Sequence, residues 1–581
     1  MTSKAHLVRH APGFNSNSKA KMSPAKNSKP RIAIVGSGCA GIGAAWALRN
    51  TGYEVHLFEK ASRLGGHTNT QIWKHLDLEV PVDTGFIVMN TATYPNFLRF
   101  LKAVDVDTVE TEMTFGVSRD GGKFEWSGEP RGIFAQRRNL FRWRHWRMIF
   151  DIVRFNQFAL DLLEDDDDEA YETRQPRLGS PRKRRRYARD LSIGQYLQQE
   201  GYSDAFRDDY LIPMTAAVWS TSPDKASLEF PAATLVRFMW NHHLLTTIAA
   251  RPPWLTIPGG SRRYVDAVLK SYPEENLLRV HTGCEVANIL RPQEGVEGGG
   301  EVALSWIDRS KEGAGSTIET STFAHVIVAC HGDEILPILT NNTTRSSEKK
   351  NKSSSGSLTY VTQTERSILS AFQTTPNTAY LHSDLSLMPS RRACWTAWNY
   401  LISSSCFIPG VSLTYDMNIL QHIPVQKYSD VLVTINPPHP PDPAKTQGKF
   451  EYRHPLYTIE SVRAQNRLKE IQGIRGVSYA GAWTKYGFHE DGFTSGLQCA
   501  VDFCGGEVPW GEVIDSEYAR GHVPVLGWRD FVLRVVILMF VLWMRLVGRV
   551  ARLPVVRQVV GSAEAVGEKV LDVGEDLGLL S

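Results

Sequence analysis

One stretch near the N-terminus decides the fold of this 581-residue chain: Arg31-Ile-Ala-Ile-Val35-Gly36-Ser-Gly38-Cys-Ala-Gly41. Its first residues predict a buried strand, and its glycines have the spacing of a tight turn into a helix. A second apolar run, Glu54-Val-His-Leu-Phe58, ends at Glu59, where an acid that binds ribose hydroxyls is expected. The order of strand, glycine turn, helix, strand and acid predicts a dinucleotide whose phosphates lie on the helix N-terminus. The predicted contacts at this end are Gly36, Gly38, Ala40, Gly41 and Glu59.

A second glycine pair follows directly, in Ala61-Ser-Arg63-Leu-Gly65-Gly66-His67. Gly65 and Gly66 let another loop approach the same pyrophosphate, and Arg63 can balance its charge. This addition is typical of proteins that hold FAD extended along the sheet, so FAD is the predicted cofactor.

The sequence resembles the flavin-containing amine oxidase superfamily over about residues 31–503, apart from low-complexity insertions. More specifically, it resembles the bacterial NAD/FAD-binding oxidoreductases that are similar to the N-terminal half of plant cyclopropane-fatty-acid synthases. The motifs that carry this resemblance are Val82-Asp-Thr-Gly-Phe-Ile-Val88, Ala393-Cys-Trp-Thr-Ala-Trp398-Asn-Tyr400, Thr414-Tyr-Asp-Met-Asn418 and Phe450-Glu-Tyr-Arg-His454-Pro.

The resemblance also implies contacts at the flavin end. A strand ends at Gly481, and a helix that opens within Gly492-Phe-Thr-Ser-Gly496 should aim the amides of Phe493 and Thr494 at the flavin ring. The backbone of Val286 should hold the adenine. Trp483 stands where the superfamily commonly has an acid, so the usual ribityl contact is in doubt.

The reaction is predicted from what lies near the ring. Amine oxidases of this superfamily usually keep a lysine there, whereas this chain has none from Ser353 to Gln426. His489 is the best titratable candidate, with Tyr486 and Asn399 behind it. The aromatic stretch from Trp395 to Tyr400 suits an apolar tunnel or core packing equally. We therefore expect hydride transfer to flavin from an apolar substrate such as a lipid acyl chain. The alternatives are a peroxide-releasing amine oxidase and a non-catalytic escort of lipids or prenylated proteins.

Composition limits the partners. The net charge of +3 gives no reason to expect nucleic acid, and no protein partner is indicated. The seven cysteines are scattered without CxxC spacing, which predicts free thiols in a reducing, intracellular compartment and no metal site. Residues 1–30 are basic and lack the apolar core of a signal peptide, so they predict a disordered tail.

The C-terminal region contains a strongly apolar segment. Phe531 to Met544 reads FVLRVVILMFVLWM and is followed by arginines. A spanning helix needs about 20 apolar residues, so we expect a membrane-surface contact through 531–557 rather than a full span, with a buried core helix as the alternative.

Together these patterns predict an α/β protein with a discontinuous, Rossmann-like FAD-binding domain formed by 31–91, 254–340 and 473–503. Residues 92–253 and 358–472 should form an α+β substrate domain with a low-complexity insertion at 163–190. A flexible loop at 341–357 and a membrane-associating helical segment at 528–560 complete the predicted architecture.

Overall fold

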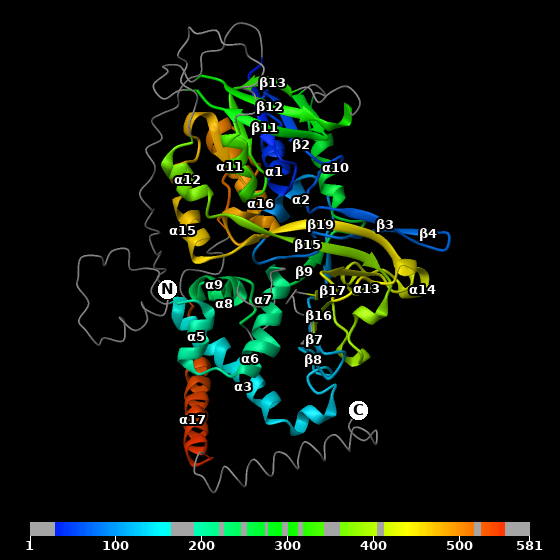
Figure 1. Cartoon of the computed structure of the whole chain (residues 1–581), viewed down its shortest axis with the longest axis vertical. Helices are drawn as coiled ribbons and strands as arrows, with labels where there is room; N and C mark the ends of the chain where they lie inside the picture. The colour runs from blue at the N-terminus through cyan, green and yellow to red at the C-terminus, as the bar shows by residue number, and fades with distance from the viewer. Residues whose placement is uncertain are drawn as a thin grey trace, which may run out of the picture.

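The computed structural model describes residues 29–163, 191–219, 226–245, 252–273, 277–292, 300–311, 318–341, 361–403, 412–515 and 524–551 (Figure 1). The predictions for residues 1–28, 164–190, 342–357 and 552–560 lie outside these ranges.

A five-stranded sheet forms from pieces far apart in sequence. Its order is β10-β2-β1-β14-β20, and all of its pairings are parallel. Its strands are β1 (Arg31–Val35), β2 (Glu54–Glu59), β10 (Leu278–Thr282), β14 (His325–Val328) and β20 (Val477–Tyr479). The central strands are buried on both faces, as a parallel sheet requires, and this explains their near-continuous apolar sequence.

Two helices of the sheet pack backbone to backbone. A Cβ at Gly496 of α16 (His489–Cys504) would lie 1.9 Å from the carbonyl oxygen of Ala40 in α1 (Cys39–Leu48). This contact brings the N-terminus of α16 beside that of α1, although the two helices are more than 400 residues apart. Further elements around the sheet are α2 (Pro95–Ala103), α10 (Arg262–Lys270), α11 (Gly332–Thr340), α12 (Gln363–Leu369) and α15 (Ile459–Arg467), with the antiparallel sheet β11 (Cys284–Leu290), β12 (Val302–Asp308) and β13 (Ile318–Phe323).

A seven-stranded sheet forms the second core, in the order β19-β15-β18-β17-β16-β7-β8. Its long outer pair crosses the middle of the molecule in Figure 1. The strands are β7 (Phe115–Arg119), β8 (Phe124–Ser127), β15 (Gln373–His382), β16 (Trp398–Ile402), β17 (Ser412–Asp416), β18 (Leu432–Ile435) and β19 (Thr446–Leu456). Smaller sheets pair β3 (Thr70–His75) with β4 (Leu78–Asp83), and β5 (Met89–Asn90) and β6 (Val109–Thr111) with β9 (Trp254–Thr256).

Helices cover the lower part of the molecule in Figure 1. They are α3 (Trp143–Phe158), α5 (Ile193–Glu200), α6 (Asp204–Phe206), α7 (Ile212–Trp219), α8 (Ala226–Glu229) and α9 (Ala232–Asn241), with α17 (Trp528–Ala551) at the lower end; the short helices α13 (Met417–Leu420) and α14 (Val425–Tyr428) lie by the seven-stranded sheet. In the described part of the chain, no helix combines the length and the apolar content that crossing a membrane requires.

One predicted boundary differs from the structure. The last helix of the flavin motif begins at His489, one turn before the predicted start, because Asp491 accepts a hydrogen bond from the Phe488 amide and caps it. In the neighbouring sheets, a single residue, Ala324, separates β13 from β14.

Candidate active site

The N-terminus of α1 has the properties of an anion site. Gly38 is its N-cap and provides no side-chain cap, and the first turn contains no acid. The amides of the first turn therefore keep free N–H groups at the positive end of the helix dipole.

The glycines before α1 differ in why they are needed. Gly36 has a φ of +99°, and a Cβ at Gly41 would lie 1.9 Å from the Gly36 carbonyl oxygen, so both are required by the chain itself. Gly38 has a φ of −63°, and apart from its two chain neighbours no heavy atom of the described residues lies within 4 Å of the position of its Cβ. Neither strain nor packing accounts for a glycine there. A bound ligand accounts for the glycine at this position, and the pyrophosphate of a dinucleotide fits that space.

The second glycine loop packs on the first. The Gly65 amide donates to the Ser37 carbonyl at 3.1 Å, and a Cβ at Gly66 would lie 3.1 Å from the Gly38 Cα. Arg63 holds this loop in shape, since its guanidinium donates to the carbonyls of Gly66 (2.8 Å) and Thr68 (3.2 Å). The cationic group therefore lies in the loop that faces the phosphate space.

Glu59 lies at the end of β2, buried beside the same turn. Its carboxylate accepts the Ser37 amide at 3.0 Å, the Ser37 hydroxyl at 2.6 Å and the Ala61 amide at 2.9 Å. A carboxylate has about four acceptor positions, so capacity remains for a ribose hydroxyl. Val286 lies buried in β11, beside an irregularity in its pairing with β12, and its adenine contact remains a prediction.

The start of α16 corrects two predicted contacts. Phe493 and Thr494 lie past the first turn, so their amides bond within the helix. Phe493 is fully buried against Phe97 and Phe100, and the Thr494 hydroxyl donates to Glu490 at 3.0 Å. The first-turn amides without a helical partner belong to His489, Glu490 and Asp491, and these face whatever lies before the helix.

His489 is held in a dry aromatic site. Its ring stacks on Phe86 with a centroid separation of 3.7 Å, and its Nε2 bonds the Tyr264 hydroxyl at 2.8 Å. The same hydroxyl bonds Thr68 at 2.6 Å. Burial lowers the pKa of His489 to about 3, so the imidazole is neutral at physiological pH. Burial therefore argues against the titrating role that the sequence predicts for His489.

Three more imidazoles gather where the two cores meet. We call His67, His331 and His454 the histidine group. The His67 ring lies 5.8 Å from that of His331, 5.1 Å from that of His454 and 5.0 Å from that of Tyr452. Burial, and then the neighbouring histidines, hold the pKa of His67 well below its usual value, and burial lowers that of His454 to about 4. Within the described ranges, no cluster of His, Cys, Asp or Glu could hold a metal ion.

A chain of amides fixes the tautomer of His454. The Thr378 backbone N–H donates to Asn436 Oδ1 at 2.8 Å, which leaves the Asn436 amide nitrogen to donate to Asn377 Oδ1 at 2.5 Å. Asn377 Nδ2 then donates to His454 Nδ1 at 2.7 Å. A neutral imidazole that accepts at Nδ1 carries its proton on Nε2. His454 is therefore held as a hydrogen-bond donor.

A sequence profile of the flavin containing amine oxidoreductases matches residues 39–409, more than half of the chain. The chain belongs to this family. It is an FAD-dependent oxidoreductase, and its glycine loops, Glu59 and the start of α16 are the parts of the structure that fit the cofactor.

Known proteins agree with the family at the level of the fold. Polyamine oxidase 3 of Oryza sativa subsp. japonica is 43% identical over 60 residues, which are 10% of this chain and 12% of that protein. A CLA-producing fatty acid isomerase from P. acnes has a TM-score of 0.51 at 12% identity, covering 83% of this chain and all of that one. Cyclohexylamine oxidase from Brevibacterium oxydans IH-35A has a TM-score of 0.50 at 11% identity, covering 82% and 99%.

The other predicted catalytic residues of this flavoenzyme are Asn399 and Tyr486. Asn399 is fully buried in β16, and its amide is used by the chain: it donates to the carbonyls of Thr396 (2.6 Å) and Thr414 (3.2 Å) and accepts the Thr396 amide. It is a structural residue. Tyr486 is half-buried and lines a small cavity with His242, Phe488 and Asp491, so its role stays a prediction.

The aromatic stretch of the flavoenzyme's seven-stranded sheet belongs to the core. Tyr400 is 2% exposed, Trp398 packs edge-on against Tyr415, and the Trp395 indole donates to the Pro389 carbonyl. Of the two interpretations left open by the sequence, core packing is the one these contacts support.

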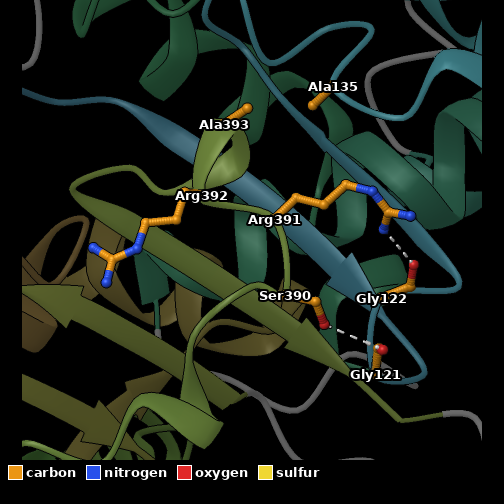
Figure 2. Close-up of a pocket in the computed structure, with 7 residues that line it drawn as sticks. All are labelled: Gly121, Gly122, Ala135, Ser390, Arg391, Arg392 and Ala393. Carbon is orange, nitrogen blue, oxygen red and sulfur yellow. Dashed lines mark hydrogen bonds between the residues drawn. The ribbon is translucent and has the colours of Figure 1, made fainter. Parts of the chain in front are cut away.

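An open groove of about 640 Å³ lies elsewhere on this sheet (Figure 2). Arg391 bonds the Gly122 carbonyl at 2.9 Å, while Arg392 points away and stacks on Trp395. The groove is lined by the β7–β8 turn and residues 390–393, so it is separate from the flavin elements.

Buried neutral histidines predict acid sensitivity of the flavoenzyme. Burial lowers the pKa values of His242, His325, His382 and His454 to about 4. The unfolded chain, with histidine pKa values near 6.5, binds more protons below that pH, so stability is full above about pH 6.5 and falls towards pH 4. Each such histidine should cost about 1.4 kcal/mol per pH unit in that window.

Denaturant unfolding at several pH values measures this slope. His382→Gln should reduce the pH dependence of the unfolding free energy by the equivalent of about one proton. The buried His382 bonds the Thr434 hydroxyl and cannot be hydrated. His439→Gln, at an exposed position, is the matched control and should leave the slope unchanged. Equal slopes for both variants would contradict the assignment.

Proposed function

We propose that this flavoenzyme oxidises or desaturates an apolar substrate such as a lipid acyl chain. The observation that carries the proposal is the neutral histidine group beside the phosphate loops. Its nearby carboxylates are already paired: Asp333 with Arg453, and Glu334 with Lys60. A site of neutral imidazoles and neutralised acids suits an uncharged substrate better than an ammonium ion.

Desaturation removes two hydrogens from neighbouring carbons. When bound, FAD would supply the acceptor for one hydrogen with its electron pair, and the protein would have to accept the other hydrogen as a proton. The proton needs a base that is unprotonated at working pH. His67 is the candidate for this role, because its Nε2 is buried and has no hydrogen-bond partner among the residues that the structure describes.

His454 takes a different part in the same proposal. With its proton fixed on Nε2, it can donate a hydrogen bond to an acceptor beside the ring but cannot take up the substrate proton there. The amides of Asn377 and Asn436 act through it and are positioning residues.

An aromatic wall near the start of α16 supports an apolar substrate. Phe488 stacks on Phe238 at 4.9 Å and 11°, and Trp219 packs on Phe238 at 4.5 Å. The Trp219 indole donates to the Tyr486 carbonyl, which ties the wall to the flavin motif. In this proposal, a substrate bound at the start of α16 would meet this apolar surface, which excludes water.

The fold by itself does not choose the substrate. By name, proteins of this fold include a fatty acid isomerase and a cyclohexylamine oxidase. The motif resemblance to proteins related to cyclopropane-fatty-acid synthases favours the acyl chain. Asp491 lines the small cavity beside Tyr486, and a carboxylate there would favour the rival amine substrate. Burial raises the pKa of Asp491 to about 7, which favours the neutral acid and so weakens its attraction for an ammonium ion.

Anaerobic bleaching of the flavin tests the proposal. The purified protein should be yellow, and its flavin absorbance should fall on mixing with a fatty acid or phospholipid but stay unchanged with polyamines and aryl amines. Bleaching by an amine with peroxide release in air would establish the rival activity. Protein that is colourless after gentle purification would support the non-catalytic escort of lipids or prenylated proteins instead.

A further inference from the structure

The two faces of helix α17 are the opposite of those of a surface helix in water: charged side chains face the protein and apolar side chains face outward. Arg534 of α17 pairs with Asp161 at 2.7 Å, Asp530 accepts from Gln157, and Ile537 is 3% exposed against the protein. The helix runs antiparallel to α3, with Phe540 against Phe150 at 4.7 Å and Met544 against Arg147. The face that packs on the protein therefore contains the ion pair.

The opposite face of α17 is almost wholly apolar. Trp528 is 74% exposed, Phe531 69%, Leu542 63% and Trp543 52%. The remaining exposed apolar side chains of this face are Val532, Val535, Val536, Leu538, Met539, Leu546 and Val547. A helix in water shows the reverse pattern, so the medium outside α17 is expected to be apolar.

A second element extends this surface. Leu140, Phe141, Trp143 and Trp146, on the turn into α3, are all more than 40% exposed. They lie within about one or two helical turns of Arg147, which touches Met544 of α17. The two elements thus present tryptophans and aliphatic side chains at the same end of the molecule (Figure 1).

The charges of this surface indicate which partner binds it. Among the described side chains of α17, Asp530 is the sole acid and faces the protein, while Arg529 and Arg545 are exposed. A second copy of the chain would bring the same arginines and no opposing acid from this face. Anionic lipid headgroups over acyl chains match both the arginines and the apolar side chains.

We propose that α17 and the turn before α3 form a membrane-docking surface that lies on an anionic bilayer. Arginines at its edge stay with the headgroups while the tryptophans and leucines enter the interface. The inference is independent of the proposed substrate, because it depends on the outer face of α17 and not on the flavin site.

Vesicle flotation of the full-length holoprotein tests this surface. The protein should float with vesicles of phosphatidylcholine and phosphatidylserine, and less with phosphatidylcholine alone. Leu542→Gln and Trp543→Gln should each lower the partition coefficient roughly tenfold, because each removes a large apolar side chain from the interface. Arg545→Gln should lower binding about fivefold, and the loss should disappear in high salt.

The matched control is Leu78→Gln, since Leu78 is 42% exposed on the β3–β4 hairpin, away from α17. It should float like the wild type, and all variants should keep their flavin absorbance. Wild-type protein that stays unbound to both vesicle types overturns the proposal. So does a dimer by light scattering that Leu542→Gln and Trp543→Gln dissociate, because the second copy would then be the occupant.

Discussion

The Gly38→Val protein should fold and bind no FAD at concentrations that saturate the wild type. Among the described residues, no atom other than those of its two chain neighbours lies within 4 Å of the position that a Cβ would take at Gly38, so a Cβ there meets no clash within the chain. The valine would occupy the position where the pyrophosphate must approach the amides of α1. We expect FAD affinity to fall at least about 100-fold, or about 3 kcal/mol, whereas the unfolding free energy of the FAD-free protein should change by about 1 kcal/mol.

Flavin absorbance after reconstitution measures the affinity, and circular dichroism reports the fold. Gly128→Val is the matched control, because Gly128 is exposed and its nearest neighbour is the Phe115 carbonyl at 3.8 Å. It should bind FAD normally. Normal FAD binding by Gly38→Val would mean that the space before α1 does not hold the pyrophosphate.

The glycine turn was predictable because its physics is local. A strand, a turn that needs positive φ at Gly36, and a helix follow one another along the chain, so the sequence contains the whole argument. The start of α16 was harder to predict, since it depends on whether Asp491 caps the helix, and the glycines at 492 and 496 suggested a later start. Phe493 and Thr494 were assigned to the flavin by the family resemblance, and the earlier start of α16 places them past its first turn.

The histidine group could not be assembled from sequence. His454 occurs in a motif that carries the family resemblance and His67 ends the second glycine loop, but no periodicity relates a loop after β2 to a strand near residue 450. Their proximity follows from the way β19 crosses the junction of the two cores. Burial then shifts their pKa values, and burial is a tertiary property. The absence of lysine from Ser353 to Gln426 is the sequence feature on which the expectation of a substrate other than an amine depends.

Asn377→Asp should slow flavin reduction by about 100-fold at pH 7 while FAD remains bound. A carboxylate at this position accepts a hydrogen bond where the amide donates one, so it selects the His454 tautomer with its proton on Nδ1. His454 then lacks the Nε2–H group that we propose donates a hydrogen bond beside the flavin ring. The carboxylate should also raise the pKa of His454 above about 4, which adds a new limb to the pH profile of flavin reduction between about pH 4 and 7.

A double-mutant cycle separates this positioning role from a general loss of stability. His454→Gln removes the titrating ring, so adding Asn377→Asp to it should cost little further rate if the amide acts through His454. The new limb in the pH profile should be absent from the double variant. Single-turnover reduction, with flavin absorbance as the readout of binding, measures all of these proteins. Rate losses that simply multiply, with one pH profile throughout, would show that Asn377 serves the stability of β15 and not the orientation of His454.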